Sequence, residues 1–155
     1  MLPADMPTAE EQIELLAFEA ASEAFFLPVR QVKEIRSWSE PTPLPLAEPA
    51  MKGVINLRGT VLPLVDLATA LQLPDTGCAP PRVIVVLEDR GRITGLIVTR
   101  VIDIISVPAS TLKPPPQISA HPPGPGIAAI ALHDGKLIRV LCPKQLFPAA
   151  REDAA

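Results

Sequence analysis

Hydrophobic residues along the chain occur in short runs that are separated by glycine, proline and charged residues. Runs that are rich in valine, isoleucine and leucine and bounded by turn residues are typical of β-strands. They predict strands over residues 13–18, 24–27, 54–57, 61–65, 83–87, 93–98, 127–132 and 137–141. The run 83–87 is apolar at every position, which indicates a strand that is buried on both faces.

Glycine and proline mark the connections between these strands. Gly59, Gly91 and Gly135 each lie between two predicted strands, so they predict three hairpins. The proline-rich segments 41–49 and 113–126 predict two surface loops.

Two short helical segments interrupt the strands. Pro28 suits the first position of a helical turn in which Val29 and Val32 share one face. Asp66 is a suitable N-cap for a short helix that reaches residue 71. The sequence therefore predicts an all-β fold with a few short helices.

The two halves of the chain repeat this plan. Residues 25–35 align without gaps with residues 94–104, and apolar residues fall in matching places. The spacing from Gly59 to Asp66 also recurs between Gly135 and Cys142. We infer a weak internal duplication of one β unit, with a chance similarity of apolar patterns as the alternative.

Composition narrows the class of protein. Of 155 residues, 48% are hydrophobic and 20% charged, which suits one packed domain. The chain has 20 prolines, where average usage gives about 8, and this argues against a helix bundle. A net charge of −3, 3% aromatic residues and the lack of tyrosine disfavour a nucleic-acid-binding protein.

Cysteine usage and hydropathy indicate the compartment. Cys78 and Cys142 allow one disulfide but lie in no cysteine-rich motif, so we expect free thiols in the cytoplasm. The N-terminus lacks the pattern of a secretory signal, and no apolar run reaches the ~18 residues of a membrane span. Residues 1–11 and 149–155 are expected to be flexible tails.

Residues that could perform catalysis or bind a metal are few and scattered. His121 lies in the proline-rich segment 113–126, and His133 lies beside Asp134 in a predicted turn. Neither histidine has a sequence neighbour arranged for activation, and the isolated cysteines do not supply the three or four ligands of a zinc site. We therefore expect no catalytic residues, no bound metal and no cofactor.

Glycine and acidic residues have structural interpretations. No Lys-Ser/Thr pair follows Gly53 or Gly59, which excludes a Walker phosphate loop. Pairing, capping and turns explain Glu34, Asp66 and Asp103 better than acid–base chemistry. The sequence thus favours a binding module over an enzyme with a hidden site.

Residues 51–67 closely resemble the signature of the CheW-like family of bacterial chemotaxis coupling proteins. The matching residues are Gly53, Asn56, Leu57, Arg58, Gly59, Pro63, Asp66 and Leu67. Val32, Glu34 and Ile35 match a second family motif, and the resemblance extends over residues 13–147. Cys142 departs from it, because an acidic residue is expected there.

This resemblance implies two small five-stranded, SH3-like β-barrels within one domain over residues 12–148. The two sub-domains would cover about 12–75 and 82–148, and strands could be exchanged between them. The implied function is a non-enzymatic adaptor that couples chemoreceptors to the histidine kinase CheA. The partners would be the cytoplasmic tip of a receptor and the regulatory domain of CheA, with no nucleic acid and no membrane insertion. The implied location is cytoplasmic, at receptor arrays beneath the inner membrane.

The resemblance also implies the site. Val32, Gly53, Arg58 and Val83 match family positions for receptor binding, around a groove that would accept an apolar helix face. Arg58 is expected to pair with Glu34 in a partly buried site, because a guanidinium can donate two hydrogen bonds to one carboxylate.

A regulatory binding module is the alternative function. Such a module would be related to the C-terminal domain of CheA or to a CheW–receiver fusion, and it would act in another two-component array. The chain has no receiver-like βα repeat and no ATP-binding glycine motif, so only the binding part would be present.

Overall fold

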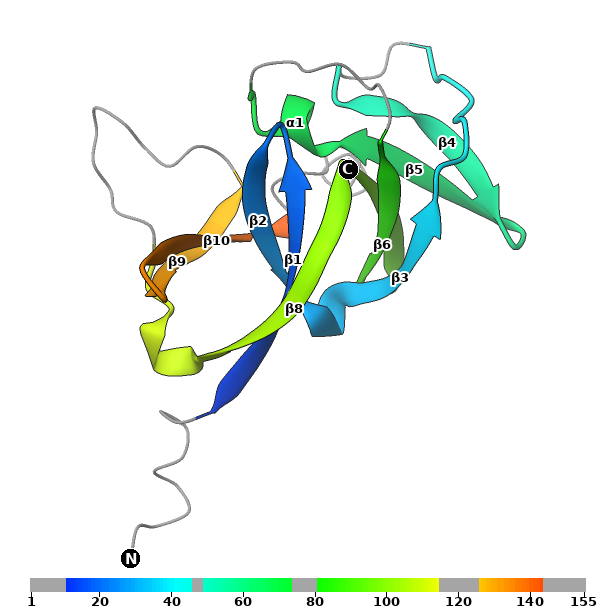
Figure 1. Cartoon of the computed structure of the whole chain (residues 1–155). Coiled ribbons are helices and arrows are strands. Elements are labelled where there is room, and N and C mark those ends of the chain that lie inside the picture. Colours follow the sequence, from blue (N-terminus) through cyan, green and yellow to red (C-terminus); the bar gives the residue numbers. More distant parts are fainter. Residues whose placement is uncertain (1–10, 46–48, 74–80, 115–125, 144–155) are drawn as a thin grey trace, which may run out of the picture.

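The computed structural model describes residues 11–45, 49–73, 81–114 and 126–143, and its ribbon is dominated by β-strands (Figure 1). Sheet A contains, in spatial order, β8 (Arg100–Pro108), β1 (Gln12–Ala20), β2 (Glu23–Pro28), β10 (Lys136–Leu141) and β9 (Ile127–His133). Sheet B contains β3 (Val32–Ser37), β6 (Val83–Asp89), β7 (Arg92–Val98), β5 (Thr60–Asp66) and β4 (Met51–Leu57). The predicted all-β fold with two five-stranded units is confirmed.

Short helices are confined to connections. The 3₁₀ turn η2 (Val29–Gln31) joins β2 to β3, the 3₁₀ turn η3 (Ala109–Thr111) follows β8, and α1 (Leu67–Ala70) follows β5. The helical turn predicted after Pro28 therefore ends one residue early, because Val32 already begins β3.

The sheets do not coincide with the two sequence ranges 12–75 and 82–148. β1 and β2 belong to the first range, yet they lie in sheet A with three strands of the second. β6 and β7 belong to the second range, yet they lie in sheet B with three strands of the first. Each half of the chain therefore contributes one pair of strands to the sheet that contains the other three strands of the opposite half.

The two sheets have the same topology. Each strand has a counterpart five places along the chain: β1 corresponds to β6, β2 to β7, β3 to β8, β4 to β9 and β5 to β10. If every strand is replaced by its counterpart, the strand order of one sheet becomes that of the other. Leu64 pairs with Gly95 in sheet B, and the matching residues Val140 and Phe26 pair in sheet A. The structure therefore supports the internal duplication that the sequence suggested.

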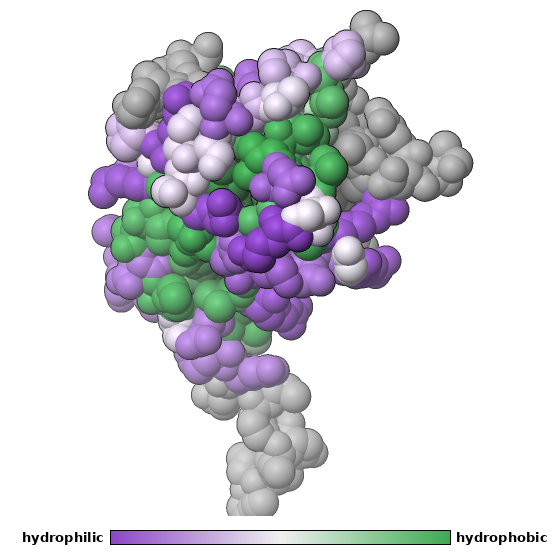
Figure 2. Space-filling model, turned by 90° about the vertical axis from the view of Figure 1, so that its right-hand side faces the viewer, coloured by the Kyte–Doolittle hydropathy of each residue, from purple (hydrophilic) through white to green (hydrophobic). Residues whose placement is uncertain are grey.

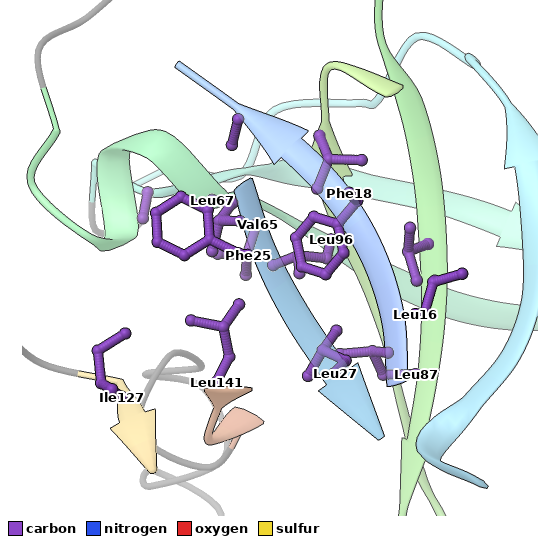
Figure 3. Close-up of a cluster of buried hydrophobic side chains, with 14 residues drawn as sticks. Leu16, Phe18, Phe25, Leu27, Val65, Leu67, Leu87, Leu96, Ile127 and Leu141 are labelled. Carbon is purple, nitrogen blue, oxygen red and sulfur yellow. The ribbon is translucent and has the colours of Figure 1, made fainter. Parts of the chain in front are cut away.

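Three apolar clusters hold the sheets together. The cluster that we call the central cluster contains Leu16, Phe18, Phe25 and Leu27 from sheet A and Val65, Val85, Leu87 and Leu96 from sheet B (Figure 3). A second cluster lies within sheet A, and a third lies within sheet B. Because the central cluster takes side chains from both sheets, the two sheets share one core.

Several sequence expectations concern residues outside the described ranges. These are His121, Cys78, the chain ends 1–10 and 144–155, and most of the segment 113–126.

Candidate protein-interaction site

An ion pair joins the two edge strands of sheet B. Arg58 lies at the turn of the β4–β5 hairpin with a φ of +50°, and Gly59 follows with a φ of +88°. The Asn56 side-chain oxygen accepts a hydrogen bond from the Gly59 backbone N–H at 2.9 Å and so fixes this turn. In that position Arg58 Nη2 donates to Glu34 Oε1 of β3 at 2.9 Å.

Glu34 receives a second, weaker contact. Arg36 Nη1 lies 3.4 Å from Glu34 Oε2, so one carboxylate faces two guanidinium groups. The hydrogen bond from Arg58 is the main reason that the pKa of Glu34 lies below its ordinary value of 4.5; partial burial opposes this effect, and Arg36 adds to it. Glu34 is therefore charged at neutral pH.

The ion pair lies at the surface, and of its two side chains only that of Glu34 is partly buried. The Arg58 side chain is 62% exposed and that of Glu34 is 27% exposed. Water and salt screen such a pair, so its contribution to the free energy of folding is small. Its geometry instead presents a fixed guanidinium beside the edge strand β3.

Gly53 is buried in β4, so it contributes shape rather than a contact surface. Its φ is +143°, and a Cβ atom there would overlap the carbonyl oxygen of Thr42. Thr42 and Val54 exchange two backbone hydrogen bonds of 2.8 and 3.0 Å, which hold the segment after β3 against β4. Only glycine lets these two backbones approach so closely.

Val32 and Val83 lie at opposite ends of the β3–β6 ladder. Val32 pairs with Leu87, and Val83 pairs with Ser37. Both valines are partly buried and pack against the central cluster. They share one face of sheet B but do not contact each other across this ladder.

Exposed isoleucines lie on β3 of sheet B and on β8 of sheet A. Ile35 lies between the two valines, pairs with Val85 of the central cluster and is 47% exposed. The matching residue of β8, Ile104, pairs with Leu16 of the same cluster and is 52% exposed; its neighbour Ile102 is 48% exposed. We call Val32, Ile35, Val83, Ile102 and Ile104 the apolar strip.

Apart from Val83, which lies on β6, the residues of the apolar strip lie on β3 and β8, two edge strands that the hydrophobic pattern did not predict. Ile35, Ile102 and Ile104 were accordingly missing from the sequence-based site, although Ile35 belongs to a recognised motif. The signal that could have found them is the alignment of residues 25–35 with 94–104, which matches Ile35 to Ile104. On the face shown in Figure 2, hydrophobic residues gather in patches that polar residues separate.

The remaining signature residues have structural roles. Asp66 accepts hydrogen bonds from the Thr69 N–H at 3.1 Å and the Thr69 hydroxyl at 2.6 Å, so it caps α1 as predicted. Leu57 is buried in the third cluster. Cys142 occupies the equivalent position to Asp66, because its N–H bonds to Gly126 as that of Asp66 bonds to Ala50.

Within the described residues, no group of three or more His, Cys, Asp or Glu side chains could hold a metal ion. Nε2 of His133, the last residue of β9, lies 3.6 Å from Oδ2 of Asp134 in the exposed turn that follows. In the same part of the chain, no helix has the length and hydropathy that crossing a membrane requires.

Two β-sheets with a shared core, exposed isoleucines on two edge strands and a surface ion pair suit a protein-interaction module. The profile of the CheW-like domain family matches residues 14–151, and the chain belongs to this family. The chain is similar to the probable chemotaxis protein CheW of Rhizobium etli, with 34% identity over 92% of both chains. It is also similar to the chemotaxis protein CheW of Bacillus subtilis, with 31% identity over 90% of this chain and 88% of the relative.

A solved structure agrees with these relatives. The scaffolding protein TtCheW of Thermoanaerobacter tengcongensis superposes with a TM-score of 0.81 at 27% identity, covering 89% of this chain and 94% of that chain. The expected adaptor function in chemotaxis is thereby confirmed at the level of the family. The comparisons give no support to a module related to the C-terminal domain of CheA or to a CheW–receiver fusion.

Proposed function

We propose that this chain couples chemoreceptors to the histidine kinase CheA without catalysing a reaction itself. It acts in the cytoplasm at receptor arrays beneath the inner membrane. One surface binds the cytoplasmic tip of the receptor, and another binds the regulatory domain of CheA. Receptor state then changes kinase activity by shifting the population of the bound states.

The apolar strip carries the proposal for the receptor. Its five residues lie on β3, β6 and β8 beside the central cluster, where an amphipathic helix could bury its apolar face. Val32 and Val83 supply the partly buried ends of the strip on sheet B, and Arg58 supplies a charge that orients a polar helix edge. Gly53 contributes by fixing the backbone of β4, which precedes the Arg58 turn.

Co-sedimentation of the purified chain with receptor-bearing membranes, with and without CheA, tests this function. We expect Val32→Asp and Ile35→Asp to lower the receptor-bound fraction at least about tenfold, since a buried charge in the interface is costly. Ile35 is exposed, so its variant tests binding without disturbing the core.

Leu137→Asp is the matched control, because it places the same charge on an exposed apolar residue of the β9–β10 hairpin. It should leave receptor binding unchanged. Normal receptor binding by both strip variants would show that the receptor binds elsewhere.

A further inference from the structure

The equivalent hairpins β4–β5 and β9–β10 differ in the number of residue pairs that join them to the neighbouring strand of their sheet. In sheet B, β5 pairs in parallel with β7 at three positions, from Leu64↔Gly95 to Asp66↔Ile97. In sheet A, β10 pairs in parallel with β2 at one position, Val140↔Phe26. The β9–β10 hairpin therefore has the shorter main-chain ladder to its neighbour.

Local sequence explains this difference. Pro28 stands in β2 where β7 has Ile97, and a proline has no N–H to donate to a ladder. A shift of register between Val140 and Leu141 also disturbs β10 at the point where β5 continues its pairing. Both features end the β2–β10 ladder early.

One side chain compensates for the short ladder. Arg139 Nη1 donates to Glu23 Oε1 at 2.7 Å, and its Nη2 donates to the carbonyl oxygen of Ala24 at 3.0 Å. The same guanidinium lies over the Phe25 ring, 4.4 Å from its centroid. Arg139 thus binds three consecutive residues of β2, whereas the equivalent residue of β5 is Pro63, which can form none of these bonds.

We infer that the β9–β10 hairpin opens locally, separately from the rest of the fold. The contacts of Arg139 with Glu23, Ala24 and Phe25, which we call the clasp, keep this hairpin packed on β2. Opening separates Ile138 and Val140 from the other residues of the second cluster. It also moves the exposed pair Leu132 and Leu137 away from the other three strands of sheet A. The β4–β5 hairpin, which carries Arg58, has the longer ladder and stays closed. The fold thereby combines one rigid hairpin with one adjustable hairpin.

Hydrogen–deuterium exchange of the full chain, followed by mass spectrometry of peptides, tests the clasp. In the unmodified protein, amides of β9 and β10 should exchange at least about tenfold faster than those of β4 and β5. Arg139→Ala should raise exchange in residues 127–141 by a further factor of at least about ten, because local opening no longer breaks the clasp. Exchange in sheet B should not change.

Arg100→Ala is the matched control. Arg100 of β8 donates a hydrogen bond to Glu19 of β1 at 2.8 Å, at the edge of sheet A opposite to β9. Its removal should not accelerate exchange of β9 and β10. Glu23→Gln, which keeps the shape but weakens the clasp, should give an intermediate rate. Equal exchange of the two hairpins in the unmodified protein, or an equal rise over the whole chain in Arg139→Ala, would overturn the inference.

Discussion

Individual residues set the geometry of the candidate site through backbone conformation. Arg58 and Gly59 both have positive φ values, which match the right-handed twist of the strands that they join. The Asn56 side chain satisfies the Gly59 amide, so the turn that presents Arg58 is fixed locally. This turn places the Arg58 side chain within hydrogen-bond distance of Glu34.

Gly53→Ala should be strongly destabilising, because the new Cβ atom meets the Thr42 carbonyl oxygen and the backbone has a positive φ. We expect a loss of about 2–4 kcal/mol in the free energy of unfolding. Urea unfolding followed by the fluorescence of Trp38, the single tryptophan of the chain, measures it. Gly135→Ala is the control, because its φ is +76° but the space around it is open, and it should cost roughly 1 kcal/mol. Equal costs would show that the close approach to Thr42 is unimportant.

The Glu34–Arg58 pair should make stability depend on pH in the acid range. The pKa of Glu34 is lowered in the folded protein, so the pair stabilises the fold fully above the ordinary value of 4.5. That contribution is lost as the pH falls through the lowered pKa. Glu34→Gln should therefore be less stable than the unmodified protein at neutral pH, and the difference should vanish in acid. Urea midpoints over this pH range measure it; added salt should shrink the difference, and a difference independent of pH would contradict the assignment.

At the scale of elements, most of the strands could be predicted and two could not. Strands 54–57 and 83–87 are apolar enough to be recognised without their neighbours. β3 and β8 are edge strands with exposed charged residues and a shift of register, so the regular alternation of a half-buried strand is lost. Because four of the five residues of the apolar strip lie on these two strands, the sequence revealed only part of the candidate site.

The cap of α1 gives a prediction at this scale. Asp66→Ala removes both hydrogen bonds to Thr69 and should lower the free energy of unfolding by about 1 kcal/mol. Thermal unfolding of the two proteins measures this loss. Cys142→Ala is the matched control at the equivalent position of the other half, and it should cost less because no such side-chain cap is replaced. A larger loss for Cys142→Ala would contradict this interpretation.

The assembly of the whole molecule was only partly visible in the sequence. Matching segments such as 25–35 and 94–104 showed that two similar units exist. They did not show which strands pair, because parallel contacts such as Val140↔Phe26 join residues far apart in the chain. The ion pair was anticipated from the family motif, but its exposure depends on how the β4–β5 hairpin lies against β3, which is a property of the complete fold.

The exchange of strands predicts that neither half of the chain folds alone. A fragment of residues 12–75 would contain β1 and β2 without β8, β9 and β10, and it would lack β6 and β7 between β3 and β5. The central cluster would lose Leu87 and Leu96, so Phe18 and Leu27 would be exposed to water. We expect this fragment and the fragment 82–148 each to unfold without a cooperative transition, as measured by circular dichroism during urea titration. The unmodified chain, as the control, should show one cooperative transition because both sheets share the central cluster. Cooperative unfolding of either isolated fragment would mean that a sheet can form from one half, against the observed pairing.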